Sequence, residues 1–141
     1  KGISNGQVID ADKEYAVAEE YRKKLKTKCP SVEQNVGNLS GGNQQKVLLA
    51  KWMFAEPDIL ILDEPTRGID VGAKYEIYCI INDLVAAGKS VIMISSELPE
   101  VLGMSDRIYI MNEGRFVGEV GKEEATSELI MSKIVKSGKG A

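Results

Sequence analysis

Residues 59–70, ILILDEPTRGID, give the strongest indication of the fold. The uninterrupted apolar run at 59–62 predicts a short strand in the interior of a parallel sheet, buried on both faces. Asp63 and Glu64 follow where this strand ends, and α/β proteins bind ligands at the carboxyl ends of their strands. Asp63 could supply an oxygen to Mg²⁺, directly or through water, and Glu64 could orient or deprotonate an attacking water. Alternatively, both acids only open a surface loop ahead of Pro65.

The remaining sequence predicts an α/β domain in which helices and strands alternate. We expect helices at 12–26, 41–55, 71–87, 97–102 and 123–136, and strands at 59–62, 90–94, 108–111 and 116–120. Gly88 is placed to cap the third helix, and Asn112, Glu113 and Gly114 form a hairpin-type turn between the last two strands. Residues 137–141 are expected to be a frayed tail.

A second informative stretch is LSGGNQQK, residues 39–46, immediately before the helix predicted at 41–55. Glycines without side chains allow a backbone to approach an anion closely, and the free N–H groups at a helix start favour negative charge. The segment therefore suits a phosphate. Two structural alternatives remain, because Ser40 could serve only as an N-cap and Gly41–Gly42 only as a flexible joint. Asp70 could likewise only cap the helix that follows it.

Composition narrows the class of protein. The chain has 141 residues, which suits one domain or a large piece of one, and is 43% apolar and 28% charged, as in ordinary globular proteins. Its net charge of −3 gives no general attraction to nucleic acid or to an anionic membrane. Cys29 and Cys79 lie far apart, which favours a reduced cytosolic protein. Histidine is absent from the sequence, which excludes histidine bases and ligands.

These motifs in combination resemble the ATP-binding cassette (ABC) ATPases. More narrowly, DEPTRGIDVGAKYEIY (63–78) and ISSELPEVLGMSDRIYIMNEGR (94–115) resemble the second cassette of the two-cassette ATPases that drive bacterial import of ribose, xylose, galactose and other monosaccharides. The resemblance implies the C-terminal part of a P-loop NTPase domain, with parallel strands flanked by helices and a C-terminal β-hairpin. Residues 1–56 would belong to the helical subdomain, with the signature motif, and 57–141 to the catalytic core.

The resemblance also implies residue roles. Asp63 would be the Walker B aspartate that binds Mg²⁺, Glu64 the catalytic carboxylate, and Asp70 part of the D-loop that links two nucleotide sites. The γ-phosphate of a nucleotide bound by the opposite cassette would be held by the signature residues Ser40, Gly41, Gly42, Asn43 and Gln45.

The cofactors implied by the resemblance are ATP and Mg²⁺. The implied partners are a second ATP-binding cassette, in the same polypeptide or in a homodimer, the membrane permease subunits and, indirectly, a sugar-binding protein, but no nucleic acid. The location would be cytoplasmic, on the inner face of the plasma membrane. Two alternatives are a cassette of a non-transport ABC protein in DNA repair or translation, and a module that acts only by docking on a partner.

The sequence departs from the family pattern at two points. There is no Walker A motif, because Gly88-Lys89-Ser90 has Asp83 where a P-loop requires glycine. The switch histidine of the family is replaced by Ser96, which cannot provide a tunable imidazole. We therefore expect a fragment of a longer protein, inactive by itself, whose own Asp63–Glu64 site hydrolyses ATP slowly or not at all. A sheet lacking its first strands would expose apolar surface and favour oligomerisation.

Overall fold

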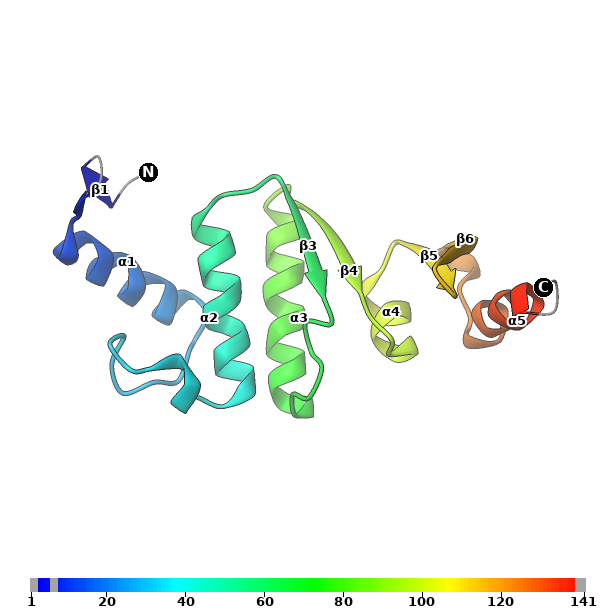
Figure 1. Cartoon of the computed structure of the whole chain (residues 1–141), viewed down its shortest axis with the longest axis horizontal. Coiled ribbons are helices and arrows are strands. Elements are labelled where there is room, and N and C mark those ends of the chain that lie inside the picture. Colours follow the sequence, from blue (N-terminus) through cyan, green and yellow to red (C-terminus); the bar gives the residue numbers. More distant parts are fainter. Residues whose placement is uncertain (1–2, 6–7, 139–141) are drawn as a thin grey trace. The chain divides into compact units, whose positions relative to one another are not determined.

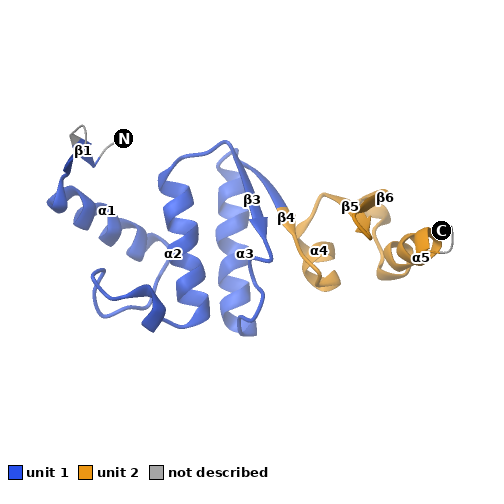
Figure 2. Ribbon diagram, viewed as in Figure 1, with its two compact units in different colours: residues 1–92 blue, residues 93–141 orange. Residues whose placement is uncertain are grey.

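The structure is a computed structural model that describes residues 3–5 and 8–138. These residues form two compact units, 1–92 and 93–141, coloured separately in Figure 2. The first contains β1 (Ser4–Asn5), β2 (Val8–Ile9), α1 (Ala11–Lys24), the 3₁₀ turn η1 (Val36–Asn38), α2 (Gly41–Phe54), β3 (Ile59–Asp63) and α3 (Val71–Ala86) (Figure 1). β4 (Ser90–Ile94) spans the boundary. The second contains α4 (Leu98–Met104), β5 (Arg107–Asn112), β6 (Arg115–Gly121), η2 (Lys122–Glu124) and α5 (Ser127–Gly138).

The helix ends follow the local sequence. Asp10 caps α1 by accepting a hydrogen bond from the amide of Lys13 at 3.2 Å. After α3 the chain turns at Gly88, whose φ of +84° is readily adopted only by glycine. The amide of Gly88 donates to the carbonyl of Val85, and that of Lys89 to the carbonyl of Leu84, which together form a Schellman motif. The predicted role of Gly88 as a helix cap is confirmed.

The strand predicted at 59–62 exists and extends to Asp63, but it is not buried on both faces. Leu60 and Leu62 belong to the core, whereas Ile59 and Ile61 are 60% and 67% exposed. Successive side chains of a strand point to opposite faces, so the described residues bury only one face of β3. A continuous apolar run indicates that both faces of a strand can be buried, but it does not indicate whether other elements cover both faces. The prediction of an interior strand is therefore wrong for this structure.

β4 shows the same pattern. It pairs with β3 in a two-stranded sheet, in which the two arrows of Figure 1 run in the same direction. We predicted a buried strand, but exposed and half-buried residues alternate along β4, and Ile92 is exposed. The expectation that apolar sheet surface would be exposed is confirmed, while the oligomerisation that could cover it stays a prediction.

The C-terminal unit is the predicted hairpin with a helix packed on it. β5 and β6 are antiparallel, and Glu113 and Gly114 between them have φ values of +47° and +74°, as a two-residue type I′ turn requires. The helix begins at Ser127, later than predicted, because residues 122–124 form a 3₁₀ turn and Thr126 Oγ1 accepts a hydrogen bond from the amide of Leu129 at 3.1 Å.

The core of this unit lies between the hairpin and α5, where Ile108, Ile110 and Val120 cluster with Ile130. The predicted tail begins two residues too early, since Ser137 and Gly138 still belong to α5, and 139–141 lie outside the described residues. Across the described ranges, every helix is too short or too polar to traverse a lipid bilayer.

Candidate functional site

The signature segment begins α2 in an unusual way. Ser40 occupies the N-cap position with extended backbone, but its side chain makes no hydrogen bond to an amide of the first turn. Its hydroxyl oxygen instead accepts a hydrogen bond from Nδ2 of Asn43 at 2.8 Å. The Oδ1 atom of Asn43 in turn accepts one from the backbone amide of Lys28 at 2.8 Å. The capping alternative for Ser40 is therefore correct in position and wrong in its hydrogen bond.

The two signature glycines have different surroundings. A Cβ atom added at Gly41 would have no heavy atom within 4 Å, so this residue presents open backbone. Gly42 is buried, and a Cβ atom there would lie 2.5 Å from Cβ of Ala73 in α3. Both residues belong to the first turn of α2, which contradicts the alternative that they form a flexible joint.

The start of α3 lies beside the start of α2. Asp70 caps α3, because its Oδ1 atom accepts a hydrogen bond from the amide of Ala73 at 3.0 Å. The predicted cap is present, and the D-loop role of Asp70 stays a prediction. A cavity of about 300 Å³ lies between the two helix starts. We call it the polar cavity, and it is lined by Lys28, Ser40, Gly42, Asn43, Asp70, Gly72, Ala73 and Glu76.

An ion pair with one buried partner, Lys46, links α2 to α3 beside this cavity. The side chain of Lys46 is only 2% exposed, and its Nζ atom lies 2.7 Å from Oε2 of Glu76, whose side chain is 46% exposed. Lys46 also donates to the carbonyl oxygen of Lys26 at 3.1 Å. The hydrogen bond from Lys46, followed by its positive charge, lowers the pKa of Glu76 below its ordinary value. Sequence reasoning missed this pair, because no local pattern links two residues thirty positions apart.

The acidic pair lies at the end of β3, as predicted. Asp63 is exposed, and Glu64 is half-buried with a φ of +47°, a left-handed conformation that is strained for a side chain of this kind. Neither acid lines the polar cavity. The described residues contain no group of three or more histidine, cysteine, aspartate or glutamate side chains placed to share a metal ion.

The predicted residues are thus divided among three places. The polar cavity brings together Ser40, Gly42, Asn43 and Asp70, while Gly41 and the half-buried Gln45 are not part of its lining. Asp63 ends β3 and Glu64 follows it, and the exposed Ser96 follows β4.

A buried carboxylate follows β4 and was not predicted. Glu100 is buried near the start of α4 and accepts a hydrogen bond from the hydroxyl of Ser95. The same hydroxyl oxygen accepts a hydrogen bond from the amide of Glu97 at 3.0 Å. Ser95 and Glu100 therefore fix the backbone on either side of Ser96.

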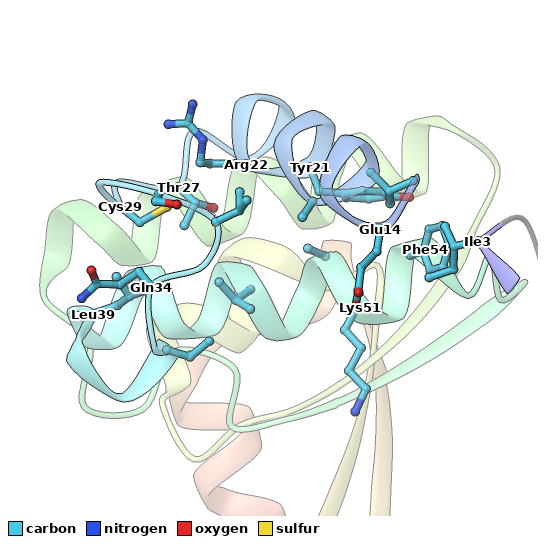
Figure 3. A pocket seen from close by; sticks show the side chains of 17 residues that line it. Ile3, Glu14, Tyr21, Arg22, Thr27, Cys29, Gln34, Leu39, Lys51 and Phe54 are labelled. Carbon is cyan, nitrogen blue, oxygen red and sulfur yellow. The ribbon is translucent and has the colours of Figure 1, made fainter. Parts of the chain in front are cut away.

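A larger cavity of about 380 Å³ lies within the N-terminal unit (Figure 3). It is bounded by α1, α2 and the segment between them, and its lining is mainly apolar, with Tyr21, Leu39 and Phe54 among the side chains that Figure 3 labels. None of the residues predicted to bind nucleotide lines this cavity, so it is separate from the candidate site.

Comparison with known proteins agrees with the motifs. A family model described as "ABC transporter" matches residues 4–67. The L-arabinose transport ATP-binding protein AraG of Geobacillus stearothermophilus is 64% identical over 135 residues, which cover 96% of this chain and 26% of that protein. The chain belongs to the ATP-binding cassette family. The xylose import protein XylG of Geobacillus kaustophilus is 59% identical and the ribose import protein RbsA of Clostridium perfringens 58% identical, over 94% and 90% of this chain.

Solved structures agree on the fold of this ABC chain. A nucleotide-free ATP-binding cassette from an ABC transporter aligns with a TM-score of 0.74 at 26% identity, over 89% of this chain and 50% of that one. Another cassette of an ABC transporter gives 0.73 at 28% identity, over 86% of this chain and 48% of that one. The predicted fold class is confirmed. The chain spans about a quarter of the length of the curated relatives it matches.

Proposed function

We propose that this chain is part of the ATP-hydrolysing subunit of a bacterial monosaccharide importer, in which ATP binding and hydrolysis drive sugar uptake. The observation that supports this best is the polar cavity, where signature residues from the start of α2 meet Asp70 at the start of α3. The relatives are named as arabinose, xylose and ribose transport proteins, which favours a monosaccharide as the cargo. The alternative of a DNA-repair or translation cassette finds no support among them.

In this proposal the start of α2 binds the terminal phosphate of a nucleotide held by a facing cassette. Ser40 and Asn43 present side-chain groups to the polar cavity, and Gly41 presents open backbone beside them. The first amides of a helix have no partner within the helix, so they suit phosphate oxygens. Gln45, one turn further on, would contribute from outside the cavity lining.

Asp63 and Glu64 belong, in this proposal, to the nucleotide site of the chain's own cassette. One exposed carboxylate at a strand end fits Mg²⁺, which commonly takes one or two protein carboxylates and completes its shell with phosphate oxygens and water. Asp63 would hold the ion, which neutralises phosphate charge when it is bound. Glu64 would orient water, and its left-handed backbone agrees with the tendency of functional residues to occupy strained conformations.

Ser96 makes the two nucleotide sites unequal. A serine hydroxyl replaces the tunable imidazole expected after β4, so the site that uses Asp63 and Glu64 would turn over slowly. The signature residues would serve the other, competent site. The cassette would act in the cytoplasm against membrane permease subunits, with a second cassette facing it and a sugar-binding protein delivering the cargo.

Gly41→Asp in the full-length protein, assembled with its permease, tests this proposal. Asp suits the first turn of a helix, and Gly41 has open space for a side chain, so folding is preserved. The added negative charge would repel the phosphate, and we expect ATPase activity to fall by at least about tenfold. The matched variant Glu64→Gln is expected to change total activity by no more than about twofold, because its site is the slow one. An unchanged rate in Gly41→Asp would contradict the proposal.

The isolated chain gives a second test. Because it has no Walker A loop, most ground-state contacts to the triphosphate are missing, and we expect no measurable ATPase and at best weak nucleotide binding. Titration calorimetry that detects micromolar affinity for Mg-ATP in this chain would show that the assignment of the phosphate-binding elements is wrong.

A further inference from the structure

One basic residue, Lys28, lines the polar cavity, and the family motifs do not account for it. The cavity lining includes two carboxylates, Asp70 and Glu76, and a single basic side chain, Lys28. The negative charge of Glu76 is paired with the ammonium group of Lys46 at 2.7 Å. The carboxylate of Asp70 accepts a hydrogen bond from the uncharged backbone amide of Ala73. A polyphosphate entering this cavity meets net negative charge unless Lys28 offsets it.

Lys28 is fixed in place by the signature segment itself. Its backbone amide donates to Oδ1 of Asn43 at 2.8 Å, and Nδ2 of Asn43 donates to the hydroxyl oxygen of Ser40 at 2.8 Å. A chain of two hydrogen bonds therefore connects the backbone of Lys28 to the serine that is proposed to bind phosphate. Because the bond uses the amide, the position of the residue does not depend on its side chain.

The ammonium group of Lys28 is available for a ligand. The residue is exposed, and within the described ranges its Nζ atom has no ion pair. The neighbouring lysines differ, since Lys46 is buried and used by Glu76, and Lys26 is exposed but does not line the cavity. Lys28 is thus the basic residue of this segment that lines the cavity without an ion pair among the described residues, while its charge helps to lower the pKa of Glu76.

We infer that Lys28 is a further nucleotide-binding residue, whose ammonium group contacts phosphate oxygens of the nucleotide held by Ser40 and Asn43. This inference rests on the proposed function and deepens it. A lysine ammonium is a compact charge on a flexible stem, which suits oxygens of a polyphosphate rather than an apolar base. Lys28 adds positive charge to a lining that holds two carboxylates, and it can form a charge-assisted hydrogen bond that the backbone amides cannot supply.

The test compares Lys28→Met with Lys28→Arg and Lys26→Met in the full-length protein assembled with its permease. ATPase rates are measured against Mg-ATP concentration at low and moderate salt. We expect Lys28→Met to raise KM about tenfold with a smaller effect on kcat, since a charge-assisted contact to the bound nucleotide is lost. Lys28→Arg keeps the charge and is expected to restore most of the affinity. Lys26→Met removes the same charge outside the cavity and is expected to change KM less than about twofold.

Salt and stability supply two further readouts. The KM of the parent protein should rise with salt more steeply than that of Lys28→Met, because salt screens the contact that this variant has lost. Melting temperatures of all variants should match, since both side chains are exposed. An unchanged KM in Lys28→Met, or an equal rise in Lys26→Met, would overturn the role of Lys28 and leave the proposed function intact. Absence of ATPase activity in the parent protein would instead overturn the proposed function.

Discussion

Replacing Gly42 with alanine should loosen the contact between α2 and α3. The new Cβ atom would lie 2.5 Å from Cβ of Ala73, whereas nonbonded carbons settle at about 3.5–4.0 Å. The helices must therefore separate by about 1 Å or more, at a cost of about 1–3 kcal/mol for overpacking. The higher helix propensity of alanine relative to glycine offsets up to about 1 kcal/mol of this cost. We expect Gly42→Ala to destabilise the N-terminal unit by about 1–2 kcal/mol.

A double-mutant cycle isolates the clash. Ala73→Gly alone should cost about 1 kcal/mol of helix propensity. In the combined variant the methyl group has moved from one helix to the other, so the clash is gone and the two propensity changes cancel. The combined variant should therefore lie within about 0.5 kcal/mol of the parent, although the two single effects sum to about 2–3 kcal/mol.

Urea titration followed by tryptophan fluorescence measures this cycle. The single tryptophan of the sequence, Trp52, lies in α2 and reports on the unit that contains the contact. A combined variant as unstable as the sum of its parts would refute the reasoning, because it would show that Gly42 and Ala73 do not share one contact.

Three further predictions concern the same unit. Glu76→Gln should lower the free energy of unfolding by about 2 kcal/mol, because it leaves the buried charge of Lys46 without its carboxylate. Lys46→Met should lower it by about 1 kcal/mol or less, because the half-exposed Glu76 stays hydrated. Equal losses in urea titrations would argue against this asymmetry. Lys46 lowers the pKa of Glu76 from its usual 4.5, so the stability that this pair contributes is present above pH 4.5 and is lost as the pH falls through the lowered pKa. Acid titration of Glu76→Gln should not show this loss of stability. Lys26, after α1, has a φ of +51°, a conformation that glycine adopts without strain. Lys26→Gly should therefore raise the midpoint of urea unfolding by an amount equivalent to about 0.5–1 kcal/mol. A lowered midpoint would show that the side chain of Lys26 contributes more to stability than relief of its backbone strain.

Much of the fold could be predicted because it depends on residues close together in sequence. Gly88 ends α3 and the Glu113-Gly114 turn joins β5 to β6, and both are local choices of backbone conformation. The exposure of Ile59 and Ile61 could not be predicted from the strand itself, since it depends on which layers cover each face.

The candidate site was predictable in composition and not in arrangement. The motif identifies Ser40 and Asn43, but it does not show how the asparagine side chain is oriented. The backbone amide of Lys28, fifteen residues before Asn43, donates to Oδ1 of Asn43, which leaves Nδ2 directed at the hydroxyl of Ser40. Lys46 reads as an ordinary polar residue of a helix, and only the position of Glu76 explains its burial. The sequence therefore indicated what the site contains, while its charge balance required the structure.

The two signature glycines show why the choice of variant matters. Side chains of successive helix residues point about 100° apart, so a side chain added at Gly41 and one added at Gly42 meet different surroundings. Gly42 is turned toward Ala73, whereas Gly41 meets open space. A bulky residue at Gly42 would abolish ATPase activity whether or not this backbone touches phosphate, because it separates α2 from α3 and disturbs the ion pair of Lys46 behind them. Loss of activity there is consequently weak evidence for phosphate binding, and Gly41, where a side chain meets no internal neighbour, is the position that can distinguish recognition from packing.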